Sequence, residues 1–457
     1  EFAIDQSLKI YSGGLGFLAG SHMRSAYELK QNLVGVGMLW KYGYYDQIRG
    51  TNGAMKPEYV QKYYSFLTDT GIVFPVEVHS ATVYVKAFLL KPDVFESAPI
   101  FLLSTDIDQN DSVSRTITNR LYDSNEATRI AQSIVLGIGG AKLLDILNMG
   151  TEIYHMNEGH ALPLSFYLYS KYKSMAEVQK RVVFTTHTPE VAGNEEHDFN
   201  LLSKMSFFNG IPDDEVRTML KVEGQRLNYT LSALRFAKIA NGVSKMHGEV
   251  AREMWSGFEG ICEITSVTNS QNKKYWKDEV LEQAYENNDD KALLARKKQM
   301  KKDLFKIVAD QTGKVFDENV LTLVWARRYA GYKRADMITA DAARFKRLLE
   351  NKDFPIQIIW AGKPYPEDYG AIDTFNGLFW KTLNMPNCAV LTGYELALSA
   401  SLKKGSDVWL NNPKLYREAS GTSGMTAAMN GSVNFSIPDG WIPEFSKHGV
   451  NSFLIEP

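Results

Sequence analysis

Cysteine is nearly absent from this sequence, which has only Cys262 and Cys388 among its 457 residues. Two thiols so far apart in the chain exclude a disulfide framework and a zinc site built from cysteine pairs. We expect two reduced and mostly buried thiols in a cytoplasmic protein. No run of about 18 consecutive apolar residues occurs either, so we expect no transmembrane helix.

An excess of either charge is also missing, because 51 Lys and Arg residues face 53 Asp and Glu residues, for a formal net charge of -2. That balance gives no basic field for nucleic acid or an anionic membrane, so neither is an expected partner. A polar glycan or a small phosphorylated ligand is compatible with it. The chain starts at Glu1 without an initiator Met or a signal-peptide pattern, which is typical of a fragment.

The composition is that of a folded globular protein, with 44% hydrophobic and 23% charged residues. A chain of this length predicts two or three domains. Aromatic residues reach 12%; sugar-binding clefts use aromatic walls, but aromatics more often form the core. The sequence has no internal repeat, low-complexity tract or Pro-rich linker.

Short apolar runs alternate with amphipathic stretches along the chain, which is typical of parallel βα units and predicts an α/β fold. The first part contains predicted strands at 33–39, 153–156 and 182–186, and a predicted helix at 126–147 capped by Asp123 or Ser124. A charged stretch at 289–310 is interpreted as a solvated linking helix.

The same alternation restarts after the charged stretch. It predicts strands at 320–326, 355–361 and 408–410 and helices at 334–349 and 396–404. We place a domain boundary near Asp317, which divides the chain into residues 1–316 and 317–457.

Two histidine-containing segments follow predicted buried strands, His155-Met156-Asn157-Glu158-Gly159-His160 and Thr185-Thr186-His187-Thr188-Pro189. Functional side chains of open α/β sheets gather beyond the carboxyl ends of the strands. Each segment taken alone is equally compatible with a structural, hydrogen-bonded histidine. Metal binding is not favoured, because the segments lack a helical His-x3-His pair or a third clustered ligand.

Three further motifs carry groups that suit anions or sugars. The first is the glycine-rich Tyr11-Ser12-Gly13-Gly14-Leu15-Gly16, where amides can approach an anion without Cβ clashes, although such patterns are more often plain tight turns.

The second motif is Trp325-Ala326-Arg327-Arg328-Tyr329-Ala330-Gly331-Tyr332-Lys333-Arg334, with four cations at a predicted strand-to-helix junction. Cations converging on a helix N-terminus make a strong phosphate site. A solvated basic turn is the alternative interpretation.

The third motif is Glu418-Ala419-Ser420-Gly421-Thr422-Ser423-Gly424-Met425-Thr426, which opens a predicted helix with small and hydroxylated residues. Free amides, hydroxyls and a carboxylate suit an oxyanion or sugar hydroxyls. A helix merely capped by hydroxyls is the alternative.

In their order, and together with Asp407-Val408-Trp409-Leu410-Asn411-Asn412-Pro413, these motifs resemble the α-glucan (glycogen and maltodextrin) phosphorylases of the short bacterial and archaeal type. The resemblance extends from Ile10 to Trp441. It implies a GT-B fold, in which two Rossmann-like domains face each other across a deep cleft. Family members have further residues before Glu1 and a helical tail after Pro457.

The resemblance also implies an activity. Enzymes of this family cleave a terminal α-1,4-linked glucose from a glucan with phosphate and release α-glucose 1-phosphate with retention. Pyridoxal phosphate is the implied cofactor, and its 5′-phosphate works beside the substrate phosphate. The implied partners are α-1,4-glucan and phosphate or glucose 1-phosphate, and a homodimer is compatible with the family.

Residue by residue, the resemblance assigns roles in both halves of the chain. Catalytic roles are implied for Arg328, Lys333 and His187. Substrate-binding roles are implied for Gly13, Gly14, His160, Asn269, Tyr332, Glu418, Ser420 and Gly421. Cofactor-binding roles are implied for Thr422, Ser423, Arg327, Trp276 and Thr426, and no metal ligand is implied.

Thr426 departs from the family, which has a lysine here that forms the Schiff base with pyridoxal phosphate. A threonine cannot do so, because that chemistry needs a primary amine. The next lysines in sequence, Lys414 and Lys447, lie outside the motif. Arg327 also stands where many members have lysine, which keeps the charge but alters its geometry.

Three functions stay open at this point. The first is a phosphorylase that binds pyridoxal phosphate without a covalent link. The second is a cofactor-free retaining glucosyltransferase that uses a nucleotide sugar, as glycogen synthases do. The third is a non-catalytic glucan-binding module. The presence of Arg328, Lys333, His187 and Glu418 favours an active enzyme.

Overall fold

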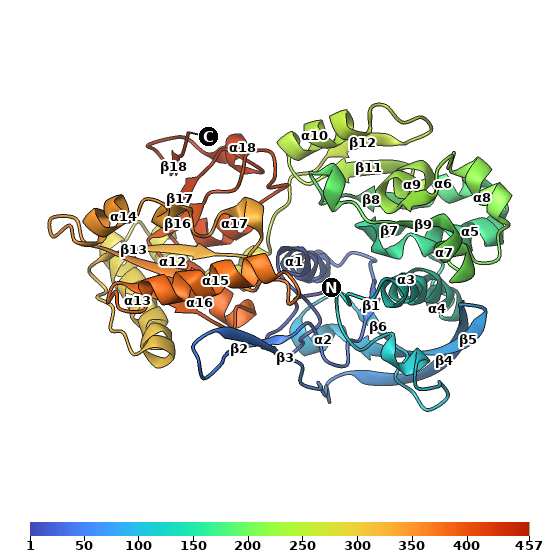
Figure 1. The fold of residues 1–457 in the computed structure, drawn as a ribbon, viewed down its shortest axis with the longest axis horizontal. Helices are drawn as coiled ribbons and strands as arrows, with labels where there is room; N and C mark the ends of the chain where they lie inside the picture. The colour runs from blue at the N-terminus through green and yellow to red at the C-terminus, as the bar shows by residue number, and fades with distance from the viewer. Residues whose placement is uncertain (457) are drawn as a thin grey trace.

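The computed structural model describes residues 1–456 and builds them on three larger sheets and two short antiparallel pairs (Figure 1). The second and third sheets are entirely parallel, which confirms the predicted α/β class. None of the helices among residues 1–456 has the length and apolar character needed to cross a membrane.

The first sheet has the strand order β1-β6-β5-β4. Its strands are β1 (Gly35–Met38), β4 (Thr68–Val78), β5 (Ala81–Leu90) and β6 (Ile100–Ser104). Only β1 was predicted, and the β4-β5 hairpin is antiparallel. Residues along these two strands alternate between buried and exposed, which suits a sheet with one solvated face.

The second sheet has the order β12-β11-β8-β7 and only parallel pairs. Its strands are β7 (Tyr154–Asn157), β8 (Val182–Thr185), β11 (Ile239–Gly242) and β12 (Glu263–Ser266). The predicted strands at 153–156 and 182–186 are confirmed within one residue. All four carboxyl ends share one edge, so the segments that follow them gather there.

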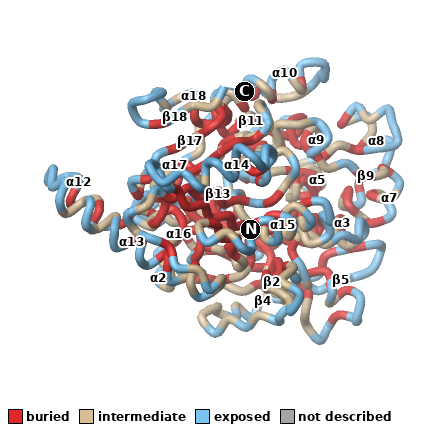
Figure 2. The backbone as a smooth tube through the Cα atoms, turned by 60° about the vertical axis from the view of Figure 1, so that its left-hand side comes forward, coloured by how far each residue is buried: buried red, intermediate tan, exposed pale blue. Residues whose placement is uncertain are grey.

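The third sheet has six parallel strands in the order β15-β14-β13-β16-β17-β18. They are β13 (Leu321–Ala326), β14 (Ile356–Ala361), β15 (Cys388–Leu391), β16 (Val408–Asn411), β17 (Val433–Ser436) and β18 (Ser452–Leu454). Its central strands are mostly buried (Figure 2). Trp325, Trp360 and Trp409 on these strands are fully buried.

Helix α13 (Asp290–Thr312) covers this third sheet together with α16 (Leu396–Gly405). Met300, Leu304 and Val308 recur at every fourth position and are buried. The interpretation of this stretch as a solvated linking helix is therefore wrong: only its opposite face is solvated.

Two predicted helices differ from those observed. The helix at 126–147 consists of α3 (Glu126–Ile134), a π-helical turn (Val135–Gly139) and α4 (Gly140–Ile146). Its cap is Asn125, whose side chain accepts a hydrogen bond from the Thr128 amide, and not Asp123 or Ser124. The helix predicted at 334–349 begins only at α14 (Ala342–Leu349), because Asp341 caps it.

The N-terminal segment connects the first and third sheets. Helix α1 (Gly14–Glu28) lies between the third sheet and the second (Figure 1). The hairpin of β2 (Asp46–Arg49) and β3 (Met55–Glu58) packs on the third sheet, where Gln47 Nε2 donates to the Gly362 carbonyl at 2.9 Å. Glu395 pairs with Lys363 at 2.9 Å and also with Lys9.

The remaining elements fill the faces of the sheets. The remaining helices are α2 (Pro92–Phe95), α5 (Pro163–Tyr172), α6 (Met175–Gln179), α7 (Phe199–Lys204), α8 (Asp213–Met219), α9 (Tyr229–Phe236), α10 (Lys245–Trp255), α11 (Lys273–Trp276), α12 (Glu279–Glu286), α15 (Tyr369–Thr382), α17 (Ser423–Ala428) and α18 (Ile442–Phe445). Strands β9 (Glu196–Asp198) and β10 (Arg226–Asn228) form the second antiparallel pair.

Candidate functional site

The segments that follow β7 and β8 meet at the carboxyl edge of the second sheet. His187 Nε2 lies 2.5 Å from Asn157 Oδ1. The Glu158 carboxylate accepts hydrogen bonds from the His187 amide at 2.7 Å and from the Thr188 hydroxyl at 3.1 Å. Glu158 therefore holds the loop that carries His187 in place, and Asn157 holds the imidazole ring of His187.

His187 is neutral at physiological pH. Burial lowers the pKa of His187 to about 3, and the nearby His247, His155 and His160 act in the same direction. A neutral imidazole suits hydrogen bonding to a sugar hydroxyl, since it is both a donor and an acceptor.

We expect the His187 imidazole to stay neutral from pH 8 down to pH 5, as followed by its 15N chemical shifts. A histidine in the unfolded chain binds a proton near pH 6.5, whereas His187 in the folded protein does so only near pH 3. The folded state therefore keeps its stability above pH 6.5 and loses stability as pH falls from about 6.5 toward 3. The unfolding midpoint of His187→Gln should therefore fall less on acidification than that of the unchanged protein. Protonation of His187 between pH 6 and 7 would contradict this.

His160 belongs to a separate charged network, although it follows the same strand. Its Nδ1 lies 3.6 Å from the Glu195 carboxylate, which also pairs with Arg129 at 2.5 Å and with His197 at 3.0 Å. Burial disfavours its charged form, but Glu195 holds the pKa of His160 above its ordinary value. The Tyr122 ring lies 6.2 Å from the His160 ring.

A group of charged side chains lies at the carboxyl end of β13. Lys333 Nζ lies 2.7 Å from Glu418 Oε2, and Arg327 Nη1 lies 3.5 Å from the same oxygen. All three side chains are at most 11% exposed. Burial favours the neutral acid, yet Lys333 and Arg327 hold the pKa of Glu418 below its ordinary value. Glu418 is therefore an ionised carboxylate.

The sequence predicted that these cations lie at a strand-to-helix junction. The structure does not place them at a helix N-terminus. The chain continues from β13 through the single 3₁₀ turn Gly331–Lys333, and α14 starts only at Ala342. Arg327 donates to Asn411, but its Nε is buried without a hydrogen-bond partner.

Arg328 lies near the glycine-rich turn. It is exposed, and Tyr122 and Tyr44 lie close enough to affect its pKa. Ser12, which directly precedes Gly13 and Gly14, also lies close enough to the Tyr44 hydroxyl to affect its pKa. Tyr44 therefore connects the glycine turn with Arg328.

Gly13 and Gly14 face open space at the start of α1. A Cβ added to either glycine would have no atom within 4 Å, and no side chain caps the first amides of the helix. The free amides are available to an anion. Tyr332, half-buried, directly precedes Lys333.

The segment that starts at Glu418 holds a buried hydroxyl without a protein partner. Ser420 Oγ is buried and makes no hydrogen bond, and Gly421 has a φ of 83°, which glycine adopts without strain. Ser423 Oγ accepts from the Trp409 indole at 3.3 Å. The Thr422 hydroxyl does not cap α17, so plain hydroxyl capping does not explain this motif.

Trp276 and Thr426 belong to a second part of the candidate site, which is less exposed to solvent than the segment at Glu418. Both are buried, and Asn430 donates to the Trp276 carbonyl at 2.9 Å and to the Thr426 carbonyl at 2.8 Å. The Thr426 hydroxyl donates to the Ser423 carbonyl at 3.1 Å. Asn269 is half-buried after β12, and its amide donates to the Val243 carbonyl at 3.0 Å.

Lys403 is a potential functional residue that the sequence analysis missed. Its Nζ lies 3.8 Å from the centre of the Trp276 ring and 5.2 Å from that of Phe17. Leu396, Ser399 and Lys403 recur at helical spacing on the buried face of α16. The sequence signal that could have identified this residue is a lysine at a position on the mostly apolar, buried face of a helix.

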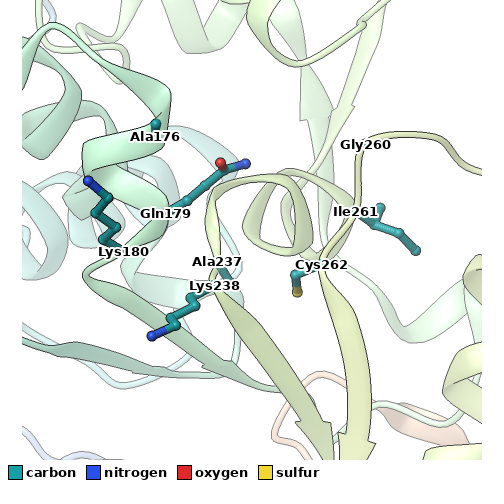
Figure 3. Close-up of a pocket in the computed structure, with 8 residues that line it drawn as sticks. All are labelled: Ala176, Gln179, Lys180, Ala237, Lys238, Gly260, Ile261 and Cys262. Atoms are coloured by element: carbon teal, nitrogen blue, oxygen red, sulfur yellow. The ribbon is translucent and has the colours of Figure 1, made fainter.

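One hollow on the surface lies elsewhere. Ala176, Gln179, Lys180, Ala237, Lys238, Gly260, Ile261 and Cys262 line it (Figure 3). Lys238 and Cys262 directly precede β11 and β12, so this pocket lies at the amino ends of the strands. His187 and Asn269 follow the carboxyl ends, so the pocket is not part of their site.

No family model matches the sequence. An uncharacterized protein of Methanocaldococcus jannaschii is 52% identical over 456 residues, which covers 100% of this chain and 86% of that protein. A maltodextrin phosphorylase of Thermococcus litoralis is 32% identical, and a glycogen phosphorylase of Aquifex aeolicus is 30% identical. Those alignments cover 100% and 96% of this chain but only 61% and 73% of the relatives.

Proposed function

Because this chain belongs to the glycogen and maltodextrin phosphorylase family, we propose that it transfers a terminal α-1,4-linked glucose from a glucan to inorganic phosphate. The product is α-glucose 1-phosphate, formed with retention. The observation that carries this proposal is the cationic group at the end of β13, where Arg327 and Lys333 surround Glu418. The reaction needs positive charge for phosphate and a carboxylate for the sugar in one dry place.

The site residues divide between phosphate and sugar in this proposal. Arg328, Lys333 and the Gly13 and Gly14 amides bind phosphate. Glucose is bound by His187, His160, Asn269, Tyr332, Glu418, Ser420 and Gly421. The short distance between Lys333 and Glu418 supports this division, because the ion pair sets a phosphate-binding cation beside a sugar-binding carboxylate.

The GT-B arrangement is part of the same proposal. Residues 1–316 and 317–457 form two Rossmann-like domains that face each other across a cleft. Two separate parallel sheets support it, each with polar side chains beyond its carboxyl edge. Helix α13 packs against α16, so the body built on the third sheet also includes residues before Asp317.

The cofactor proposed for this site is pyridoxal phosphate, which supplies a second phosphate beside the substrate when bound. The residues present fit its phosphate, since Arg327 Nε is a buried nitrogen without a hydrogen-bond partner. Thr422 and Ser423 are the other residues proposed to hold it, and Trp276 provides an aromatic wall. Thr426 does not fit its aldehyde, because a hydroxyl is no amine and this one already bonds to Ser423.

Thr426 also favours one alternative, a cofactor-free enzyme that uses a nucleotide sugar. A single assay separates the two functions: maltodextrin is incubated either with phosphate and pyridoxal phosphate or with a nucleotide-glucose donor. We expect glucose 1-phosphate from the first mixture. Glucan elongation in the second mixture alone would support the alternative, and no reaction in either would indicate a binding module.

Replacing Arg328 by alanine should weaken phosphate binding by roughly 10- to 150-fold, since one charge-assisted contact contributes about 1.5–3 kcal/mol. Titration calorimetry with inorganic phosphate measures the change. Arg344→Ala, an exposed arginine on α14, is the matched control and should bind phosphate normally. Equal affinity in Arg328→Ala and the control would remove Arg328 from the phosphate site.

A further inference from the structure

Lys403 differs from the other buried lysines among residues 1–456. Lys301 pairs with Asp407 at 2.5 Å, Lys333 with Glu418 at 2.7 Å and Lys363 with Glu395 at 2.9 Å. Lys403 is only 2% exposed, and no carboxylate or carbonyl bonds to its Nζ.

An ammonium ion buried without a partner is costly, so such a lysine gives up its proton instead. Burial alone lowers the pKa of Lys403 well below its ordinary value. Its Nζ lies over the rings of Trp276 and Phe17, whose faces attract an ammonium but offer no acceptor for a strong hydrogen bond. The fold therefore keeps a primary amine, with its pKa lowered by burial, against two aromatic rings.

The helix that carries this amine contacts the helix with the missing lysine. Helix α16, which carries Lys403, packs against α17, which carries Thr426. Asn430 links Thr426 with Trp276, whose ring lies beside Lys403. Its side-chain amide donates hydrogen bonds to the backbone carbonyls of both Thr426 and Trp276.

Tyr394 connects the same enclosure with the cationic group. Its ring lies 6.5 Å from that of Phe17, and its hydroxyl lies 3.3 Å from the Ala326 carbonyl, next to Arg327. Tyr394 thus contacts both Phe17, over which Lys403 Nζ lies, and the residue that precedes Arg327.

We propose that Lys403, from the neighbouring helix, replaces the lysine absent at position 426 and binds covalently to a phosphorylated aromatic aldehyde of the pyridoxal phosphate class. The inference rests on the proposed function. The neutral amine adds to the aldehyde carbon, a C=N bond forms, and the aldehyde oxygen leaves as water with the two amine hydrogens. The step needs no oxidant or reductant.

The aromatic enclosure explains why this amine reacts. Only an unprotonated lysine is a nucleophile, and desolvation in an apolar pocket is one way to obtain it at neutral pH. Burial lowers the pKa of Lys363 as well, but its Nζ lies 2.9 Å from Glu395, and this ion pair holds the amine away from an aldehyde.

Borohydride trapping tests the proposal. The full chain is incubated with pyridoxal phosphate, reduced so that the C=N bond becomes a stable amine, digested and analysed by mass spectrometry. We expect a phosphopyridoxyl adduct at Lys403. Lys403→Met should lose this adduct and the near-ultraviolet band of the bound aldehyde. Lys404→Met is the matched control, since the Lys404 side chain lies 3.6 Å from Asp278 instead, and it should keep both.

Lys403→Met is expected to fold, because a methionine of similar length replaces an unpaired buried amine, and circular dichroism checks this. An adduct at another lysine, or no adduct at all, overturns the proposal. A parallel assay for glucose 1-phosphate separates this result from the proposed function. Product formation without an adduct at Lys403 overturns this inference alone, whereas an adduct at Lys403 without product upholds it and overturns phosphorolysis.

Discussion

Replacing Glu418 by glutamine is expected to lower kcat for phosphorolysis by about 10²-fold while maltodextrin binding changes little. Hydrogen bonds from sugar hydroxyls to a carboxylate strengthen as positive charge develops on the sugar, and they supply several kcal/mol in the transition state. Glutamine keeps the size of the side chain but removes the charge. Loss in kcat without loss of ground-state binding is the signature of such a contact.

The structure adds a second expectation for Glu418→Gln. In the unchanged protein, the negative charge of Glu418 offsets part of the positive charge of Lys333 and Arg327. In the variant, this positive charge would no longer be offset. The KM for phosphate should therefore stay equal or fall, which argues against a general loss of structure. Glu350→Gln, an exposed residue near Lys346, is the matched control. An equal rise in both KM values with kcat unchanged would assign Glu418 to simple binding.

Moving the lysine from position 403 to position 426 is expected to move the covalent link with it. Thr426 is fully buried, so Thr426→Lys alone inserts a long side chain into a filled space and costs about 1–3 kcal/mol. It also brings a second amine toward Lys403. Adding Lys403→Met removes that amine and part of the crowding, so the double variant should recover stability.

Denaturation midpoints of the four proteins measure the coupling between these positions. Borohydride trapping should then place the adduct at position 426 in the double variant and at Lys403 in the unchanged protein. Purely additive changes in stability would mean that Lys403 and Thr426 do not share one space. An adduct that stays absent from position 426 would mean that the aldehyde does not reach α17.

Much of the fold was predictable because it depends on neighbours within a few residues. Strands such as β8 and β14 are short apolar runs that end in polar segments, and their bounds agree with the prediction within one or two residues. The start of α14 was predicted wrongly, because the pattern from Arg334 onward is compatible with a helix and only the Asp341 cap decides its first residue. The β4-β5 hairpin escaped prediction because the rest of the pattern favoured parallel units.

The sequence by itself determined the α/β class, the family and the residue types of the candidate site, since these reside in local periodicity and short motifs. Only the tertiary structure decided which charged side chains form ion pairs and which are buried away from water. Glu418 and Lys333 are 85 positions apart, yet they form a buried ion pair. Lys403 resembles any helix lysine in sequence, and only the fold buries it against Trp276 and Phe17, from distant segments, where burial lowers its pKa.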